Sequence, residues 1–329
     1  CCWARPPRST PSSPAAKSWI WPNCRRSGRA SWSLCIPYRK AGPAVEKING
    51  SLTAPAAPKI GVAKPKVIIP VFPGTNCEYD TAKAFARAGA DPEILVVRNL
   101  TPADVAESCK ALVKAIDASQ IVMLPGGFSG GDEPDGSAKF IASFFRNPAV
   151  TEAVRRLLQQ RDGLMLGICN GFQALIKLGL VPYGDIRPIT ACDPTLTFNT
   201  IGRHQSMLVH TRVASTGSPW LSKCEVGEMH TIAISHGEGR FVAPQEVLDT
   251  MLRNGQVATQ YVDLTGVPTM DQSFNPNGSV LAIEGITSPD GRVLGKMGHT
   301  ERSGENLYKN VPGDKYQPLF EGGVDYFRL

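Results

Sequence analysis

Short apolar runs alternate with segments of helical spacing from Lys66 onward, whereas the chain before that residue has no sustained period. The apolar runs predict strands at 67–72, 93–98, 120–125 and about 163–168. Helical spacing predicts helices at 77–89, 101–116, 136–146, 148–161 and 169–179. Near-continuous apolar strands separated by helices are typical of a parallel sheet with helices on both faces. The pattern therefore predicts an α/β fold with a mostly parallel sheet.

The pattern changes after Tyr183, where strand-like segments follow one another with turns such as NPNG and PDG between them. These segments are TLTFNT, MLVHTRV, TIAISH, VATQYV, SVLAIEGI and VLGKMG. Strands joined by short turns favour antiparallel pairing. We expect them to extend the sheet and to add a smaller antiparallel β layer.

Residues 1–65 differ from the rest of the chain in composition. They are rich in Pro, Ser and Arg, contain four of the five tryptophans, and end in the linker-like SLTAPAAPKIGVAKPK. The chain also begins with Cys rather than Met. We expect 1–65 to lie outside the domain, either as a disordered linker after an upstream domain or as a non-native head translated out of frame. Residues 66–329 are then the folded domain.

Charge and cysteines divide along the same boundary. The net charge is +6, but residues 1–50 hold nine Lys/Arg and one acid, so the remainder carries about −2. The pI of 8.8 therefore does not indicate a nucleic-acid-binding face on the folded part. The cysteines of the body lack both zinc spacing and the density of a disulfide scaffold, and no apolar run is long enough to span a membrane. We expect a cytoplasmic protein with no nucleic acid and no membrane as partner.

The richest segment is DGLMLGICNGFQALIKLG (162–179), an apolar strand that turns directly into an apolar helix. Cys169 stands at the turn between Gly167 and Gly171, which permit a sharp bend and close approach. The helix N-terminus offers unpaired N–H groups and a partial positive charge, which favour a thiolate and stabilise an oxyanion. Taken alone, the Gly-x-Cys-x-Gly string also fits a small buried core cysteine, although it favours a nucleophile. The features described next strengthen the interpretation of Cys169 as a nucleophile.

A thiolate nucleophile that releases an amine needs a histidine held by a carboxylate. Among the five histidines, His299 follows the strand VLGKMG, and Glu301 lies two residues later, on the same side of an extended segment. Sites in parallel sheets gather beyond the carboxyl ends of strands, where Cys169, His299 and the loop 126–132 all lie. We expect these residues to meet.

The loop PGGFSGGD (125–132) follows the third strand, and its glycines let backbone N–H groups approach a ligand. An oxyanion hole, a plain turn and a phosphate-binding loop all fit a glycine-rich segment. The Gly-Lys-Ser/Thr ending of a P-loop is missing, which disfavours the nucleotide.

Three other interpretations are weaker. Cys77 also precedes a helix, but no histidine lies near it in the sequence. His230, His236 and Glu238 are close together, but their spacing matches no zinc signature, so we expect no metal. Asn199 and Arg203 are candidates for a docking face.

Together, GICNGFQ, PGGFSGGD, SHGEGR and GHTER resemble the class I, triad-type glutamine amidotransferases, which have a flavodoxin-like fold. More narrowly, they are similar to the glutaminase portion of phosphoribosylformylglycinamidine synthase, from about Lys66 to the end. Gly-x-Cys-x-Gly-x-Gln is shared by the whole class, whereas Cys-Asn-Gly, Gly-Gly-Phe-Ser-x-Gly-Asp and Ser-His-Gly-Glu-Gly-Arg are more specific.

The resemblance implies roles for particular residues. Cys169 would be the nucleophile, His299 the acid–base and Glu301 its orienting carboxylate. Backbone N–H groups of Asn170 and of Gly127 or Phe128 would form the oxyanion hole, and Gln173, Ser235, His236 and Gly237 would hold the substrate L-glutamine. Ammonia would pass to a synthase domain or subunit that makes formylglycinamidine ribonucleotide in purine biosynthesis. ATP and Mg²⁺ are expected only there, with no cofactor in this chain.

The chain departs from the family in two ways. Many relatives have Pro-His-Pro-Glu-Arg where this sequence reads Gly298-His299-Thr300-Glu301-Arg302, which keeps the His–Glu spacing. The synthase half is missing from the sequence. Two other functions stay open: another Cys–His hydrolase on the same fold, such as a peptidase or γ-glutamyl hydrolase, and a catalytically silent docking module of a synthase.

Overall fold

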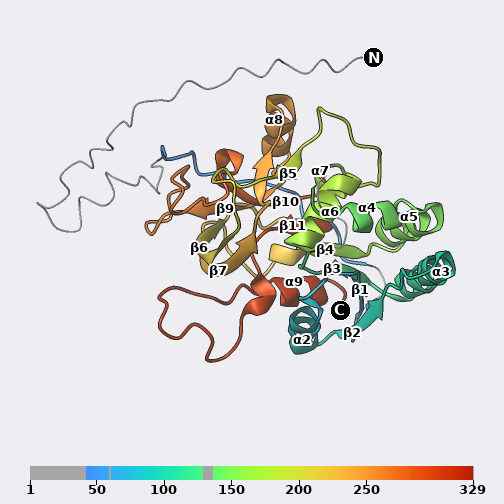
Figure 1. Cartoon of the computed structure of the whole chain (residues 1–329). Helices are drawn as coiled ribbons and strands as arrows, with labels where there is room; N and C mark the ends of the chain where they lie inside the picture. The colour runs from blue at the N-terminus through green and yellow to red at the C-terminus, as the bar shows by residue number, and fades with distance from the viewer. Residues whose placement is uncertain (1–41, 59–60, 129–135, 329) are drawn as a thin grey trace, which may run out of the picture. The chain divides into compact units, whose positions relative to one another are not determined.

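The main sheet joins a parallel half to an antiparallel half (Figure 1). The computed structural model describes residues 42–58, 61–128 and 136–328. Within them, nine strands form one sheet in the order β2-β1-β3-β4-β11-β10-β9-β6-β7, and β5 pairs with β8 in a second, two-stranded sheet. This arrangement confirms the predicted mostly parallel α/β fold with a smaller antiparallel layer.

The strands have the following bounds: β1 Lys66–Val71, β2 Asp91–Val96, β3 Ile121–Leu124, β4 Leu164–Ile168, β5 Thr195–Thr197, β6 Gln205–Val213, β7 Met229–His236, β8 Arg240–Val242, β9 Val257–Val262, β10 Ile283–Thr287 and β11 Val293–Lys296. The pairings from β2 through β11 are parallel, and those from β11 through β7 are antiparallel.

The α-helices are α2 Glu78–Arg87, α3 Pro102–Ala118, α4 Lys139–Phe145, α5 Pro148–Arg155, α6 Asn170–Leu178, α7 Leu180–Tyr183, α8 Gln245–Arg253 and α9 Leu319–Asp325. Shorter helical segments are the π-helical η1 Arg156–Gln160 and the 3-10 turns η2 Pro219–Leu221, η3 Val280–Ala282 and η4 Thr300–Arg302.

Local sequence explains why these elements form where they do. Strands β3 and β4 are buried along their whole length, because helices cover both faces of the parallel half. Helix α3 begins at Pro102, within one residue of the predicted start. The Thr101 hydroxyl accepts from the N–H of Asp104, and the carboxylate of Asp104 accepts from the N–H of Thr101.

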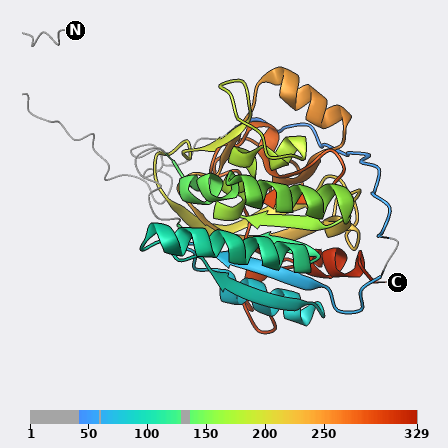
Figure 2. The same ribbon diagram turned by 90° about the vertical axis from the view of Figure 1, so that its right-hand side faces the viewer.

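The helices form two layers around the parallel strands. Helices α3, α5, α4 and α6 pack successively against one another, and Figure 2 shows α3 in teal and α5 in green lying along the sheet. Helices α2 and α9 pack together on the other side, near β1 and β2. The carboxyl ends of β1, β3, β4 and β11 are therefore left at one edge of the sheet.

The segment that precedes β1 belongs to the folded unit, which corrects the predicted boundary at residue 66. The described chain from residue 42 onward clusters as one compact unit. Arg212 on β6 donates to the carbonyl of Ile48 at 2.7 Å and to Asn49 Oδ1 at 2.6 Å, and the N–H of Val62 donates to the carbonyl of Phe327 at 2.7 Å. Two of these bonds end on backbone carbonyls and the third on an asparagine side chain, and sequence periodicity reports none of them. Residues 1–41 lie outside the described residues, so their assignment stays a prediction.

No helix among the described residues combines the length and apolar character that crossing a membrane would require.

Candidate active site

Cys169 lies at the bend between β4 and α6. Its φ of 53° and ψ of −107° place a non-glycine residue in a sparsely populated region, a strain of about 1–3 kcal/mol that structures retain mainly at functional sites. Its N–H donates to the carbonyl of Lys296, its carbonyl accepts from Gln173, and its side chain is buried. The bend therefore holds the sulfur in one place while α6 begins directly beneath it.

The glycines beside the cysteine are required by the bend. A Cβ on Gly171 would lie 1.9 Å from the carbonyl oxygen of Leu124, and one on Gly167 would lie 2.7 Å from the carbonyl carbon of Gly171. Helix α6 thus approaches β3 and β4 more closely than any side chain permits. This close approach aims the N-terminus of the helix at Cys169.

His299 and Glu301 form a buried pair opposite the cysteine. Their side chains are 2% and 0% exposed, and Nδ1 of His299 lies 2.6 Å from Oε1 of Glu301. The predicted i, i+2 relation therefore brings carboxylate and imidazole together, although the segment is the 3-10 turn η4 rather than a strand. The bond at Nδ1 leaves Nε2 for proton exchange with another group.

Electrostatics link this pair to the nucleophile. Burial lowers the pKa of His299, but Glu301 and then Cys169 and Cys77 raise it, and the pKa lies well above the usual 6.5. The raised pKa favours the imidazolium form of His299, and a cation beside a cysteine is the setting that activates a cysteine nucleophile. The sequence prediction that Cys169, His299 and Glu301 meet is consistent with this geometry.

Two backbone hydrogen bonds fix β4, β11 and β7 relative to one another around the site. Cys169 donates to the carbonyl of Lys296 at the end of β11, and His299 donates to the carbonyl of Ala233 within β7. The carbonyl of Ser235 lies 3.7 Å from Sγ of Cys169. The site therefore joins the parallel half of the sheet to its antiparallel half.

The residues predicted to form the oxyanion hole differ in whether their backbone N–H groups already make hydrogen bonds. Asn170 begins α6 and is buried, so its N–H belongs to the unpaired first turn of the helix. The N–H of Phe128 already donates to the carbonyl of Gly74 at 2.8 Å, and its side chain is exposed. Gly127, at φ 147°, has no hydrogen-bond acceptor for its N–H among the described residues. Of the two alternatives, Gly127 has the available donor, and its role stays a prediction.

The residues predicted to hold glutamine converge on the same place. Gln173 on α6 donates to the carbonyl of Glu238 at 2.6 Å and accepts from Asn170, so both ends of its amide are bonded. Ser235 and His236 end β7, and Gly237 follows. Burial, His299 and His204 lower the pKa of His236 to about 3, so this imidazole is neutral. Its Nε2 is buried and makes no hydrogen bond among the described residues.

The sequence suggested Asn199 as a candidate for a docking face, but its side chain is buried. Its Nδ2 donates to the carbonyl of His236 at 2.8 Å, and its Oδ1 faces Nδ1 of His236 at 3.2 Å and the N–H of Gly239 at 3.2 Å. Asn199 therefore orients the segment that follows β7. No short motif in the sequence marks such a bracing residue.

Sequence reasoning also missed the position of Cys77. It has no histidine near it along the chain, but its buried Sγ lies 3.9 Å from Nδ1 of His299. Nη2 of Arg302 donates to the same sulfur at 3.0 Å, and the thiol faces Oδ1 of Asn76 at 3.1 Å. Cys77 thus lies on the Glu301 side of the imidazole, away from Nε2, where it supports the ring rather than competing with Cys169.

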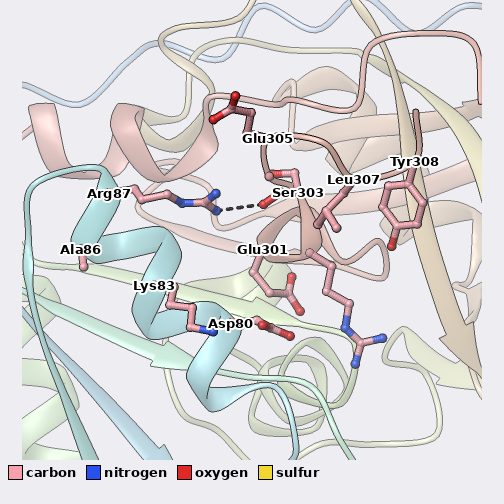
Figure 3. A pocket seen from close by; sticks show the side chains of 11 residues that line it. Asp80, Lys83, Ala86, Arg87, Glu301, Ser303, Glu305, Leu307 and Tyr308 are labelled. Atoms are coloured by element: carbon pink, nitrogen blue, oxygen red, sulfur yellow. Dashed lines mark hydrogen bonds between the residues drawn. The ribbon is translucent and has the colours of Figure 1, made fainter. Parts of the chain in front are cut away.

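A cavity of about 730 Å³ lies behind the His–Glu pair, between α2 and the segment after η4 (Figure 3). Asp80, Lys83 and Arg87 line it from α2, and Arg87 donates to the carbonyl of Ser303 at 3.0 Å. Glu301 borders the cavity, but Cys169 does not. This cavity is therefore separate from the place where a substrate meets the nucleophile.

In two groups of side chains among the described residues, three potential metal-ligand atoms lie within 4.8 Å of one another. One is Cys77 with His299 and Glu301, and the other is Cys224 with Glu228 and His230. The first belongs to the catalytic pair, where Glu301 already occupies Nδ1. The second lies elsewhere in the fold.

Comparisons with known proteins agree with this geometry. Residues 64–327 match the model of the CobB/CobQ-like glutamine amidotransferase domain. The chain is 34% identical over 254 residues to the phosphoribosylformylglycinamidine synthase subunit PurQ of Aquifex aeolicus, covering 75% of this chain and 95% of that one. The Pyrococcus furiosus subunit PurQ is 33% identical over 265 residues, covering 80% and 99%.

A solved structure gives the same result. It is a chain from the structure of PurLQS from Thermotoga maritima, with a TM-score of 0.58 and 25% identity, covering 80% of this chain and all of that one. The chain therefore belongs to the CobB/CobQ-like glutamine amidotransferase family and, within it, to the relatives of the phosphoribosylformylglycinamidine synthase subunit PurQ.

Proposed function

We propose that this chain hydrolyses L-glutamine through a thioester on Cys169 and delivers the ammonia to a synthase partner. The observation that supports this most is the Cys169–His299–Glu301 arrangement at the ends of β4 and β11. The names of the relatives give the partner reaction, formation of formylglycinamidine ribonucleotide in purine biosynthesis. ATP and Mg²⁺ are proposed to act at that partner, with no cofactor in this chain.

In the first half-reaction, the Cys169 thiolate attacks the side-chain carbonyl carbon of glutamine. The N–H groups of Asn170 and Gly127 then stabilise the oxyanion as it forms, where preorganised donors contribute most. His299 gives its proton to the departing nitrogen, which leaves as ammonia. Glu301 stabilises the imidazolium and keeps Nε2 aimed at the sulfur.

In the second half-reaction, neutral His299 takes a proton from water, which attacks the thioester and releases glutamate. The sulfur leaves as a thiolate, and the protonated imidazole is restored. Gln173, Ser235, His236 and Gly237 are proposed to surround the substrate. The neutral state of His236 suits it for hydrogen bonding to an amide or carboxylate rather than for proton transfer. The cysteines of the described residues are all free thiols, which fits the reducing conditions of the cytoplasm.

The test measures glutamate release and ribonucleotide amination with the synthase partner supplied. Cys169→Ala should abolish both with glutamine and leave amination with added ammonium salts at the wild-type rate. Cys192→Ala, at an exposed thiol, is the matched control and should behave as wild type. If the ammonia-dependent rate fell together with the glutamine-dependent rate, Cys169 would be acting through docking or folding. Cleavage of peptides at a rate similar to glutamine would favour a peptidase instead.

A further inference from the structure

A second group of polar side chains lies at the opposite end of β7 from the active site. Cys224 precedes the strand, Glu228 is the residue before it, and His230 is its second residue. One donor atom from each residue lies within 4.8 Å of the other two. The spacing Cys-x3-Glu-x-His differs from the paired-cysteine patterns by which zinc sites are recognised in a sequence.

His230 is the unexplained member of this group. Its side chain is 0% exposed, yet neither ring nitrogen makes a hydrogen bond of acceptable geometry among the described residues. A buried polar group without a partner costs about 1–3 kcal/mol, so native structures supply a partner, a water or an ion. Glu228 Oε1 lies 3.2 Å from Nε2, but it is misaligned for a hydrogen bond.

We propose that Cys224, Glu228 and His230 bind a Zn²⁺ ion. Thiolate, imidazole and carboxylate are the three ligand types that zinc takes from proteins. With bonds of about 2.0–2.3 Å, tetrahedral zinc ligands lie roughly 3.5 Å apart, so the present separations need to close by little more than an ångström. Glu228 is one-third exposed, which leaves the fourth position to water.

The surroundings of the site are compatible with an ion. Oε2 of Glu228 is held by the N–H of Glu225 at 2.8 Å, which leaves Oε1 directed at His230. A cavity of about 200 Å³ lies beside this group and is lined by His230 and Asp314. Buried Lys296 is a nearby cation that opposes a metal, but its ammonium is bonded to Thr300 and Gln317, and two anionic ligands offset its charge.

The ion would act on the fold rather than on catalysis. From His230 to Ser235 the strand advances roughly 17 Å, too far for a metal at one end to contact a substrate at the other. β7 is the edge strand of the sheet. A metal bound by Cys224 and Glu228 before the strand and by His230 within it would fix the start of β7.

The test uses the full chain with Cys1, Cys2, Cys24 and Cys35 changed to serine, so that the head contributes no thiols. After chelation and dialysis, the chain should take up about one Zn²⁺, and Co²⁺ should give a thiolate-to-cobalt absorption band. Cys224→Ser and His230→Gln should each weaken binding by more than about 100-fold, beyond the roughly 10- to 100-fold that is usual for a change outside the ligands themselves. Zinc should raise the melting temperature of the parent chain and not of these variants.

Two matched controls separate this site from other thiols. Cys192→Ser removes an exposed thiol and Cys77→Ser removes the ligand of the other cluster; both should keep stoichiometry and the cobalt band. Unchanged binding in Cys224→Ser, or loss of binding only in Cys77→Ser, would overturn the proposal, as would failure of the parent chain to retain zinc. Glutamine hydrolysis by the metal-free chain should be unchanged, so this proposal and the proposed function fail independently.

Discussion

Adding one methyl group at Gly126 should disturb the catalytic pair directly. A Cβ there would lie 2.7 Å from Cε1 of His299, 3.2 Å from Sγ of Cys77 and 3.4 Å from Cβ of Cys169. Carbon atoms in contact lie about 3.5–4.0 Å apart, so the imidazole must move by roughly 0.8–1.3 Å. The backbone of Gly126 is outside the left-handed region, so alanine itself is not strained there.

The size of the effect follows from that displacement. A misplacement of about 1 Å costs on the order of 10²-fold in rate, or about 2.7 kcal/mol of transition-state stabilisation. The ring has little freedom to avoid it, because Glu301 holds Nδ1 at 2.6 Å and the side chain is buried. We therefore expect Gly126→Ala to lower kcat for glutamate release by roughly 30- to 300-fold, with a smaller change in KM.

The assay compares this variant with Gly304→Ala, where the nearest atoms are at ordinary contact distances of 3.5 Å from Arg87 and Leu307. Gly304→Ala should retain the wild-type rate, and both variants should melt within a few degrees of wild type. A wild-type kcat in a folded Gly126→Ala protein would refute the argument that the ring position limits the rate.

Three further predictions concern the buried groups. Glu301→Gln removes the charge that raises the pKa of His299. The wild-type pair stabilises the fold fully below pH 6.5 and less as the pH rises through the raised pKa. The variant should therefore melt below the wild type, by a difference that shrinks as the pH is raised. The pKa of His236 in the folded chain is about 3. Lowering the pH from 6.5 should therefore reduce the free energy of unfolding of the wild type by up to about 1.4 kcal/mol per pH unit. In His236→Asn, urea titrations at several pH values should show no such contribution to the pH dependence. Gly171→Ala, whose Cβ would meet the Leu124 carbonyl, should lower the free energy of unfolding by at least about 1–3 kcal/mol, and a wild-type urea midpoint would contradict the close approach of α6.

The elements around the nucleophile were predictable because local chemistry and tertiary packing agree there. Thr101 with Asp104 caps α3, and the apolar strands have the burial that their composition indicates. Helix α8 was not predicted, because the strand-rich texture of the region obscured nine residues that bury only Leu248 and Met251. The segment is amphipathic, but nine residues make only about two and a half turns, and strand-like runs lie on both sides of it.

The candidate site was predictable where a motif carries its own geometry. Cys169 between glycines and the His299–Glu301 pair are local patterns, and their meeting follows from the common edge of a parallel sheet. The position of Cys77, 222 residues from His299 in the chain, follows no local rule. The same holds for Asn199, whose amide braces a segment nearly forty residues away.

These distant contacts explain why the antiparallel half of the sheet matters for the chemistry. The cysteine bend belongs to β4 and is fixed by the parallel half, but the backbone of His299 is held by the carbonyl of Ala233 in β7. β7 is reached from β4 only through β11, β10, β9 and β6. A shift in the register of β10, β9 or β6 would move the Ala233 carbonyl that holds the backbone of His299, while Cys169, bonded to Lys296 on β11, stayed in place. Such a change should separate nucleophile from base without unfolding the parallel core, and it should lower kcat more than it lowers the melting temperature.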